Sequence, residues 1–275
     1  MRYRSMTSLL LVITTLSFGV VAFAQKASNW GGQADGPVPK LPPPDPNVSF
    51  NPRDFSGVWE TNHQSTNGYR GMTDEAGIPP RTPWAEQVFR SRITGRPTKE
   101  KPGLPPALGN DPIMSCNPYG IPRLLFYTNP LEFFHTPDRI LMLFEWQRAT
   151  REIWMDGRQL PVDPDPRWMG YSVGRWEGDT LVVDTSGFDD RAWLDQYGNV
   201  YSADMRFQER WKRTGRDTLE VVYRLEDPKS YTRPWVSTTK AFRRSAHELR
   251  EELCAPMDEG YFNENIRDPA AGIRK

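Results

Sequence analysis

Proline placement constrains this chain more than any other feature of its sequence. The chain holds 26 prolines in 275 residues, against an average share of roughly 5%. Because proline lacks a backbone N–H and breaks helix interiors, a mostly helical fold is excluded. The prolines gather in residues 25–52, 79–112 and 161–166. The stretches between them must therefore supply most of the regular structure.

The proline-poor stretches have the pattern of short β-strands. From residue 123 onward, apolar runs alternate with tight turns such as residues 177–179 and 214–217. Short strands separated by turns, without long helices between them, are typical of sandwiches and barrels. We predict a mostly all-β fold: an antiparallel sandwich or barrel with long Pro-rich loops. The clearest alternation places on one strand face Leu219, Val221, Tyr223 and Leu225.

The individual elements can be assigned from the same pattern. Pro83, Trp84, Val88 and Phe89 predict a short helix over 83–93, because proline suits a first helical turn. Asp156-Gly157 is a common hairpin dipeptide and predicts a tight turn there. We expect strands at 57–59, 124–127, 133–135, 140–146, 152–155, 171–176, 180–184, 205–211, 219–225, 236–242 and 249–254.

The N-terminal residues have the three parts of a secretory signal peptide. Arg2 and Arg4 are followed by an uncharged, mostly apolar run over 8–24, which ends in the small-residue exit Ala22-Phe23-Ala24. We predict a cleaved signal peptide at 1–24 and a periplasmic or secreted protein without stable membrane insertion. A Pro-rich flexible tether at 25–52 would follow, and then one β-barrel domain at 53–275 with a loop excursion at about 64–122.

The cysteine count fits an exported chain. Cys116 and Cys254 are its two cysteines, and an isolated pair in an oxidising compartment most simply forms one disulfide. The alternative is metal or redox chemistry, but CxxC spacing and a neighbouring histidine cluster are missing. We therefore predict a disulfide that ties the C-terminal part of the fold to its middle.

Charge and missing motifs exclude several classes of function. Lys plus Arg and Asp plus Glu are equal at 35 each, with no long basic run, so nucleic acid is not an expected partner. The sequence lacks a P-loop, a nucleophile elbow, a His-Glu-x-x-His motif and a dinucleotide fingerprint. With three histidines in all, we predict neither a metal site nor a cofactor. The sequence leaves the oligomeric state open.

Gly57-Val58-Trp59, followed by a series of hairpins, resembles the lipocalin and wider calycin pattern. In that pattern a Gly-x-Trp opens the barrel, and a basic residue from a late strand packs on the Trp at the closed end. Longer stretches over residues 53–255 resemble a widespread, largely uncharacterised family of exported bacterial proteins. The resemblance implies export and an antiparallel, lipocalin-like β-barrel with long Pro-rich loops, and it implies no settled activity. Its matching segments include CNPYGIPR at 116–123, residues 145–158, GYSVGRWEGDTLVVDT at 170–185, and residues 187–188, 193–195 and 209–210.

One departure from that family bears on function. Its members often carry a histidine shortly before the Glu-Arg strand, but residues 202–205 hold none in this chain. A role that depends on that histidine is therefore not expected here.

Several polar residues interrupt apolar strands and are candidates for chemistry. His135 closes an aromatic strand and has a side chain suited to proton transfer. Glu145 continues an apolar strand face, so it needs a cationic partner, for which Arg123 and Arg151 are candidates. Asp190 lies in an acidic, aromatic loop. The alternative for each is structural: a turn cap, or an ion pair that closes one end of the barrel.

A second group of candidates would contact the body of a ligand. Aromatic side chains bury large areas and suit pockets for planar or apolar molecules. Glu209 shares a strand face with Phe207 and Trp211 and is therefore expected to point inward. The alternative is a well-packed core. The predicted ligand-binding residues, besides Arg123, are Phe134, Tyr171, Trp176, Trp193 and Glu209.

Together these features favour an exported barrel that binds a small apolar or aromatic molecule. The alternative is a cofactor-independent lyase, isomerase or hydrolase acting on an aromatic or terpenoid-like molecule. In it His135 would exchange protons, Glu145 or Asp190 would orient it, and Arg151 would stabilise negative charge. A third possibility is a partner-binding envelope protein that uses residues 64–112 as its contact surface.

Overall fold

The computed structural model describes residues 49–61, 72, 77–94, 103, 109–254 and 263–272. All of them belong to one compact unit, Val38–Lys275. The expected signal peptide at 1–24, most of the tether at 25–52 and much of the excursion at 64–122 lie outside the described residues.

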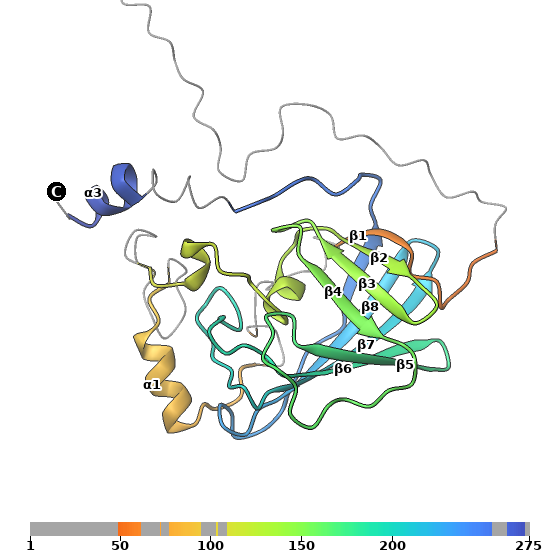
Figure 1. The fold of residues 1–275 in the computed structure, drawn as a ribbon, viewed down its shortest axis with the longest axis horizontal. Coiled ribbons are helices and arrows are strands. Elements are labelled where there is room, and N and C mark those ends of the chain that lie inside the picture. The colour runs from red at the N-terminus through yellow and green to blue at the C-terminus, as the bar shows by residue number, and fades with distance from the viewer. Residues whose placement is uncertain are drawn as a thin grey trace, which may run out of the picture. The chain divides into compact units, whose positions relative to one another are not determined.

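Nine strands of the described chain close into a β-barrel, which confirms the predicted fold class (Figure 1). The ring runs in chain order from β1 to β8, and β10 closes it by pairing with both β8 and β1. A short strand, β9, is added along β8. The strands are β1 (Gly57–Thr61), β2 (Leu131–His135), β3 (Arg139–Phe144), β4 (Thr150–Trp154), β5 (Tyr171–Glu177), β6 (Thr180–Ser186), β7 (Arg206–Gly215), β8 (Thr218–Glu226), β9 (Trp235–Val236) and β10 (Lys240–Arg244).

The barrel is mixed, which corrects the expectation of a purely antiparallel one. β4 and β5 run parallel, with Ile153 opposite Ser172 and Trp154 opposite Val173. The sequence pattern suggested a hairpin at Asp156-Gly157, but the chain instead continues through a long connection over 155–170. A parallel neighbour requires such a crossover, because the chain must return to the end at which β4 began. We call residues 155–170 the crossover loop.

Three predicted strands are wrong or altered. Residues 123–126 form a 3-10 helix, η4 (Arg123–Phe126), whose side chains are all buried. A short, fully apolar run cannot be told from a buried helical turn by periodicity alone. The run at 236–242 is split into β9 and β10. The run at 249–254 makes a single isolated bridge, Trp146 to Glu252.

The predicted helix is confirmed over nearly the same residues. α1 (Pro83–Ser91) begins with Thr82 as N-cap, whose hydroxyl accepts a hydrogen bond from Ala85 N–H, and with Pro83 in its first turn. Its buried side is formed by Ala85 and Phe89, whereas the expected Trp84 is largely exposed. The remaining short helices are η3 (Pro112–Ser115), η5 (Asn263–Arg267) and α3 (Asp268–Ala270). None of the helices in the described ranges is long and apolar enough to cross a membrane.

One end of the barrel is closed around Trp59 on β1. Its indole Nε1–H donates to Phe55 O at 2.7 Å. Two guanidinium groups lie over its ring, that of Arg213 on β7 at 5.4 Å and that of Arg244 on β10 at 6.0 Å. Such cation–π contacts stabilise partly desolvated rings. The resemblance to lipocalins predicted this packing of late-strand basic residues on the Trp.

The predicted disulfide is present between Cys116 and Cys254, 138 residues apart in the chain. Cys116 caps the C-terminal end of η3. The bond therefore attaches residues after β10 to a loop that precedes β2. A disulfide is typical of proteins in oxidising environments outside the cytoplasm.

We expect the variant C116S/C254S to unfold at lower denaturant concentration than the oxidised protein. Closing a loop of this length lowers the entropy of the unfolded chain, which corresponds to roughly 3–5 kcal/mol of stability. Urea unfolding followed by tryptophan fluorescence measures the difference, with the reduced wild type as the matched control. Equal stability of all three forms would contradict this role.

Candidate functional site

The barrel interior contains an ion pair between Arg151 on β4 and Glu209 on β7, and both side chains are fully buried. Arg151 Nη2 lies 2.5 Å from Glu209 Oε1, and Nη1 lies 3.1 Å from Oε2. The other N–H groups donate to Thr185 Oγ1 at 2.9 Å, Ser172 Oγ at 3.1 Å and the sulfur of Met142 at 3.7 Å. All five guanidinium donors of Arg151 are therefore used.

The carboxylate of Glu209 is equally well satisfied. Its Oε2 also accepts a hydrogen bond from Trp211 Nε1–H at 2.9 Å. A buried charge is tolerated only when it is paired and hydrogen-bonded in this way. The inward position predicted for Glu209 is confirmed, because its side chain is fully buried. Its partner is Arg151 on β4. This network uses all of the Arg151 donors inside the barrel and leaves none of them for a ligand.

The other predicted charged residues have separate partners. Glu145, just after β3, accepts a hydrogen bond from Arg250 N–H at 3.0 Å. Arg123 forms a bidentate pair with Asp111 at 2.8 and 2.6 Å, beneath the ring of Tyr119 at 4.6 Å. Glu145 is thus paired with neither of the arginines proposed for it. Asp190 is exposed.

His135 lies at the end of β2 and contacts the segment that precedes β1. Its Nε2 accepts a hydrogen bond from Phe55 N–H at 3.1 Å. Burial lowers the pKa of the imidazole, and this effect is opposed by the nearby Asp54 carboxylate. His135 pairs with Ile140 across the β2–β3 hairpin, whereas Glu145 lies beyond the other end of β3. The structure therefore does not bring the predicted catalytic residues together.

The predicted aromatic residues are also dispersed. Trp176 packs edge-on against Phe55, with ring centroids 5.4 Å apart. Trp193 is buried beneath the guanidinium of Arg92 at 5.3 Å. Phe134 is exposed. Tyr171 points outward, and its hydroxyl accepts a hydrogen bond from Arg158 at 3.0 Å.

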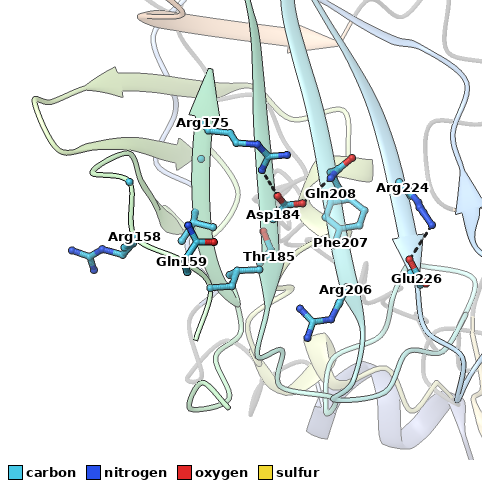
Figure 2. A pocket seen from close by; sticks show the side chains of 14 residues that line it. Arg158, Gln159, Arg175, Asp184, Thr185, Arg206, Phe207, Gln208, Arg224 and Glu226 are labelled. Carbon is cyan, nitrogen blue, oxygen red and sulfur yellow. Dashed lines mark hydrogen bonds and ion pairs between the residues drawn. The ribbon is translucent and has the colours of Figure 1, made fainter. Parts of the chain in front are cut away.

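A hollow lies on the outer face of β5 to β8, where the crossover loop forms one wall (Figure 2). Its volume is about 490 Å³. Strand register creates its floor, because outward-facing positions on four neighbouring strands are direct cross-strand partners. These positions are Val173, Asp184, Gln208 and Arg224. We call this hollow the arginine cleft. Its polar lining comprises Arg158, Gln159, Arg175, Asp184, Thr185, Arg206, Gln208, Arg224 and Glu226.

Most charges in the arginine cleft neutralise one another. Arg175 pairs with Asp184 at 2.5 Å, and the hydrogen bond to this carboxylate raises the pKa of the guanidinium. Arg224 pairs with Glu226 at 2.9 Å. Gln208 Nε2 donates to the other oxygen of Asp184 at 2.8 Å. These contacts fix the floor and orient its side chains.

Arg206 differs from its neighbours. It is exposed, and within the described ranges its guanidinium has no ion-pair or hydrogen-bond partner. Figure 2 shows it at one end of the cleft, apart from the paired side chains. The lining holds four arginines and two acidic residues, so the cleft has a positive excess. An unpaired guanidinium in a hollow is suited to binding a carboxylate, phosphate or sulfate group.

Sequence reasoning missed this cleft. None of the predicted catalytic or ligand-binding residues lines it. A signal was present, because the inward face assigned to Phe207 and Glu209 places Arg206 and Gln208 outward. What the sequence did not show is that the crossover loop folds against this face. Among the described residues, no group of three or more His, Cys, Asp or Glu side chains is arranged to hold a metal ion.

Comparison with known proteins identifies no similar protein. No family model, no curated protein and no solved structure matches the chain.

We expect Glu209→Gln to lower the free energy of unfolding by about 3–5 kcal/mol, because the buried Arg151 would lose its counter-charge. Urea unfolding measures the loss. The matched control is Glu177→Gln, which removes the same charge from an exposed pair with Arg210 and should cause little change. A similar effect of both substitutions would show that the interior pair is not a structural requirement.

His135 gives the fold a dependence on pH. Because the imidazole pKa is lowered in the folded protein, the unfolded chain binds a proton more readily. This stabilisation is complete above the unfolded pKa of about 6.5 and is lost as the pH falls through the folded pKa. Denaturant midpoints at pH 8 and pH 5 should therefore differ less in His135→Gln than in wild type. His247→Gln is the control and should behave like wild type; equal differences in all three proteins would refute the prediction.

Proposed function

We propose that this chain is an exported small-molecule-binding β-barrel whose ligand is an acid with an apolar or aromatic body. The observation that carries the proposal is the unpaired guanidinium of Arg206 in a cleft whose other charged side chains form a fixed floor. A ligand anion would supply the counter-charge that Arg206 lacks. The remaining arginines are already paired: Arg175 with Asp184, Arg224 with Glu226, and Arg158 with Asp156 at 2.5 Å. One anionic group therefore matches the free charge.

The arginine cleft also offers contacts to an apolar body. Val173 forms part of its floor, and Leu160 lies in the wall formed by the crossover loop. The aliphatic parts of the arginine side chains add further apolar surface. A cleft of mixed lining with a few convergent polar groups is typical of small-molecule sites.

The location of the proposed site differs from that expected for a lipocalin-like barrel. Inside the barrel, Arg151 and Glu209 are paired with each other and with neighbouring side chains and offer no free charge to a ligand. The outer face of β5 to β8 supports binding better, because its hollow lies between the strands and a loop. Export is supported by the signal-peptide pattern at 1–24 and by the disulfide.

Binding is favoured over the lyase, isomerase or hydrolase alternative. Catalysis without a cofactor needs an acid or base and a charge-stabilising group on the same substrate. His135 and Glu145 lie toward opposite ends of the β2–β3 hairpin, and the donors of Arg151 are consumed in the interior. No observation on the described residues favours the enzyme.

Isothermal titration calorimetry of the purified protein tests the proposal. The probes are 4-methylbenzoate and 1-naphthoate, each compared with its neutral amide. We expect both acids to bind and both amides to bind at least about tenfold more weakly, since a charge-assisted hydrogen bond is lost.

Arg206→Gln should weaken binding of both acids by about tenfold or more. The matched control is Arg210→Gln, an outward arginine on the same strand that pairs with Glu177 outside the cleft. It should bind like wild type. Failure of both acids to bind at millimolar concentration, or equal effects of the two substitutions, would overturn the proposal.

A further inference from the structure

A second hollow continues from the arginine cleft beyond Arg206. Its volume is about 390 Å³, and Arg206 lines both hollows. We call it the distal hollow. The residues on which the argument depends are Asp163, Pro164, Ser186, Gly187, Asp204 and Arg206.

The two hollows follow one another along the same three segments. On β6, Thr185 lines the arginine cleft and Ser186 the distal hollow. On β7 the boundary falls at Arg206 itself. In the crossover loop, residues 157–160 face the first hollow and residues 162–164 the second. The hollows therefore form one trough between the crossover loop and the ends of β6 and β7.

The wall of the distal hollow is held in place by backbone contacts. Arg167 N–H donates to Gly187 O at 3.0 Å, and Asp189 N–H donates to Arg167 O at 3.0 Å. Pro164 approaches Gly187 so closely that an added Cβ would lie 2.5 Å from its ring. The approach requires glycine at 187, whose φ is also positive. The trough is thus formed by fixed elements.

The distal hollow carries charge of the opposite sign. Asp163 and Asp204 line it, and neither carboxylate has an ion-pair partner in the described part of the chain. The hydroxyl of Ser186 is a further unsatisfied group there: the residue is 7% exposed, and its Oγ has no hydrogen-bond partner among the described residues. A buried hydroxyl without a partner is uncommon.

We infer that the trough binds an amphoteric molecule, with its anion on Arg206 and a cationic amine toward Asp163 and Asp204. This inference rests on the proposed function and names the ligand class of the same site. The unpaired charges of the trough are one guanidinium and two carboxylates, so a ligand with separate acidic and basic groups complements both ends. Asp204 and Arg206 are two residues apart, which places their Cα atoms at most about 7 Å apart. The charged side chains thus start from neighbouring backbone positions, which suits a ligand whose two charges lie on a body the size of one ring.

Three probes of the same size separate the contributions of the two charges. 4-(Aminomethyl)benzoate carries the acid and the amine on opposite ends of a ring, 4-methylbenzoate carries the acid alone, and 4-methylbenzylamine carries the amine alone. By titration calorimetry we expect the amphoteric probe to bind about tenfold tighter than 4-methylbenzoate. The amine alone should bind more weakly than the amphoteric probe, because it leaves Arg206 without a counter-charge.

Substitutions assign the preference to the distal hollow. The variant D163N/D204N should bind 4-methylbenzoate like wild type and lose the tenfold preference for the amphoteric probe. Asp165→Asn is the matched control, because Asp165 lies in the same loop but does not line the hollow, and it should keep the preference.

The outcomes distinguish this inference from the proposed function. If 4-methylbenzoate binds through Arg206 but the amphoteric probe binds no tighter, or if D163N/D204N retains the preference, the inference is overturned and the acid site stands. If neither acid binds, the proposed function itself fails.

Discussion

The buried ion pair between Arg151 and Glu209 is the interaction on which the barrel depends. The backbone pairing of β4 with β5 is short, with two register pairs at Ile153 and Trp154. Arg151 spans this joint through its side chain, since its Nε donates to Ser172 on β5 and its Nη2 to Thr185 on β6. The guanidinium thus links strands that the backbone joins only weakly. Glu209 makes that link possible by supplying the counter-charge.

The same joint creates the outer trough. Because β5 runs parallel to β4, the chain must travel back along the outside of the barrel before β5 begins. That return path is the crossover loop, and its prolines at 161, 164 and 166 remove backbone donors that would otherwise need partners. The loop then lies against outward-facing charges on β6 and β7. A topological requirement of the sheet has therefore produced the hollow that holds Arg206.

The sequence predicted those features that depend on local pattern. Alternation along β7 and β8 placed Glu209 inward, the pair of cysteines predicted the disulfide, and Gly57-x-Trp59 predicted the closed end. It did not identify the partner of Arg151, because a carboxylate 58 residues away leaves no trace in strand periodicity. The prediction of a strand at 124–127 was wrong for a related reason. An apolar run that is buried on all sides has no periodicity to distinguish a strand from a helical turn. The candidate site escaped prediction because it depends on where a loop folds.

The parallel joint divides the ring into two series of neighbouring hairpins, β2 to β4 on one side and β5 to β8 on the other. Within each series, every strand pairs with the next strand in the chain, so their contacts are close in sequence and can form early in folding. Closure of the ring between β1 and β10 requires contacts between distant segments, and the Arg151–Glu209 pair joins residues 58 positions apart. Arg151 and Glu209 lie on opposite sides of that division. Their ion pair is therefore expected to form late, as the two halves meet, so its loss should mainly accelerate unfolding.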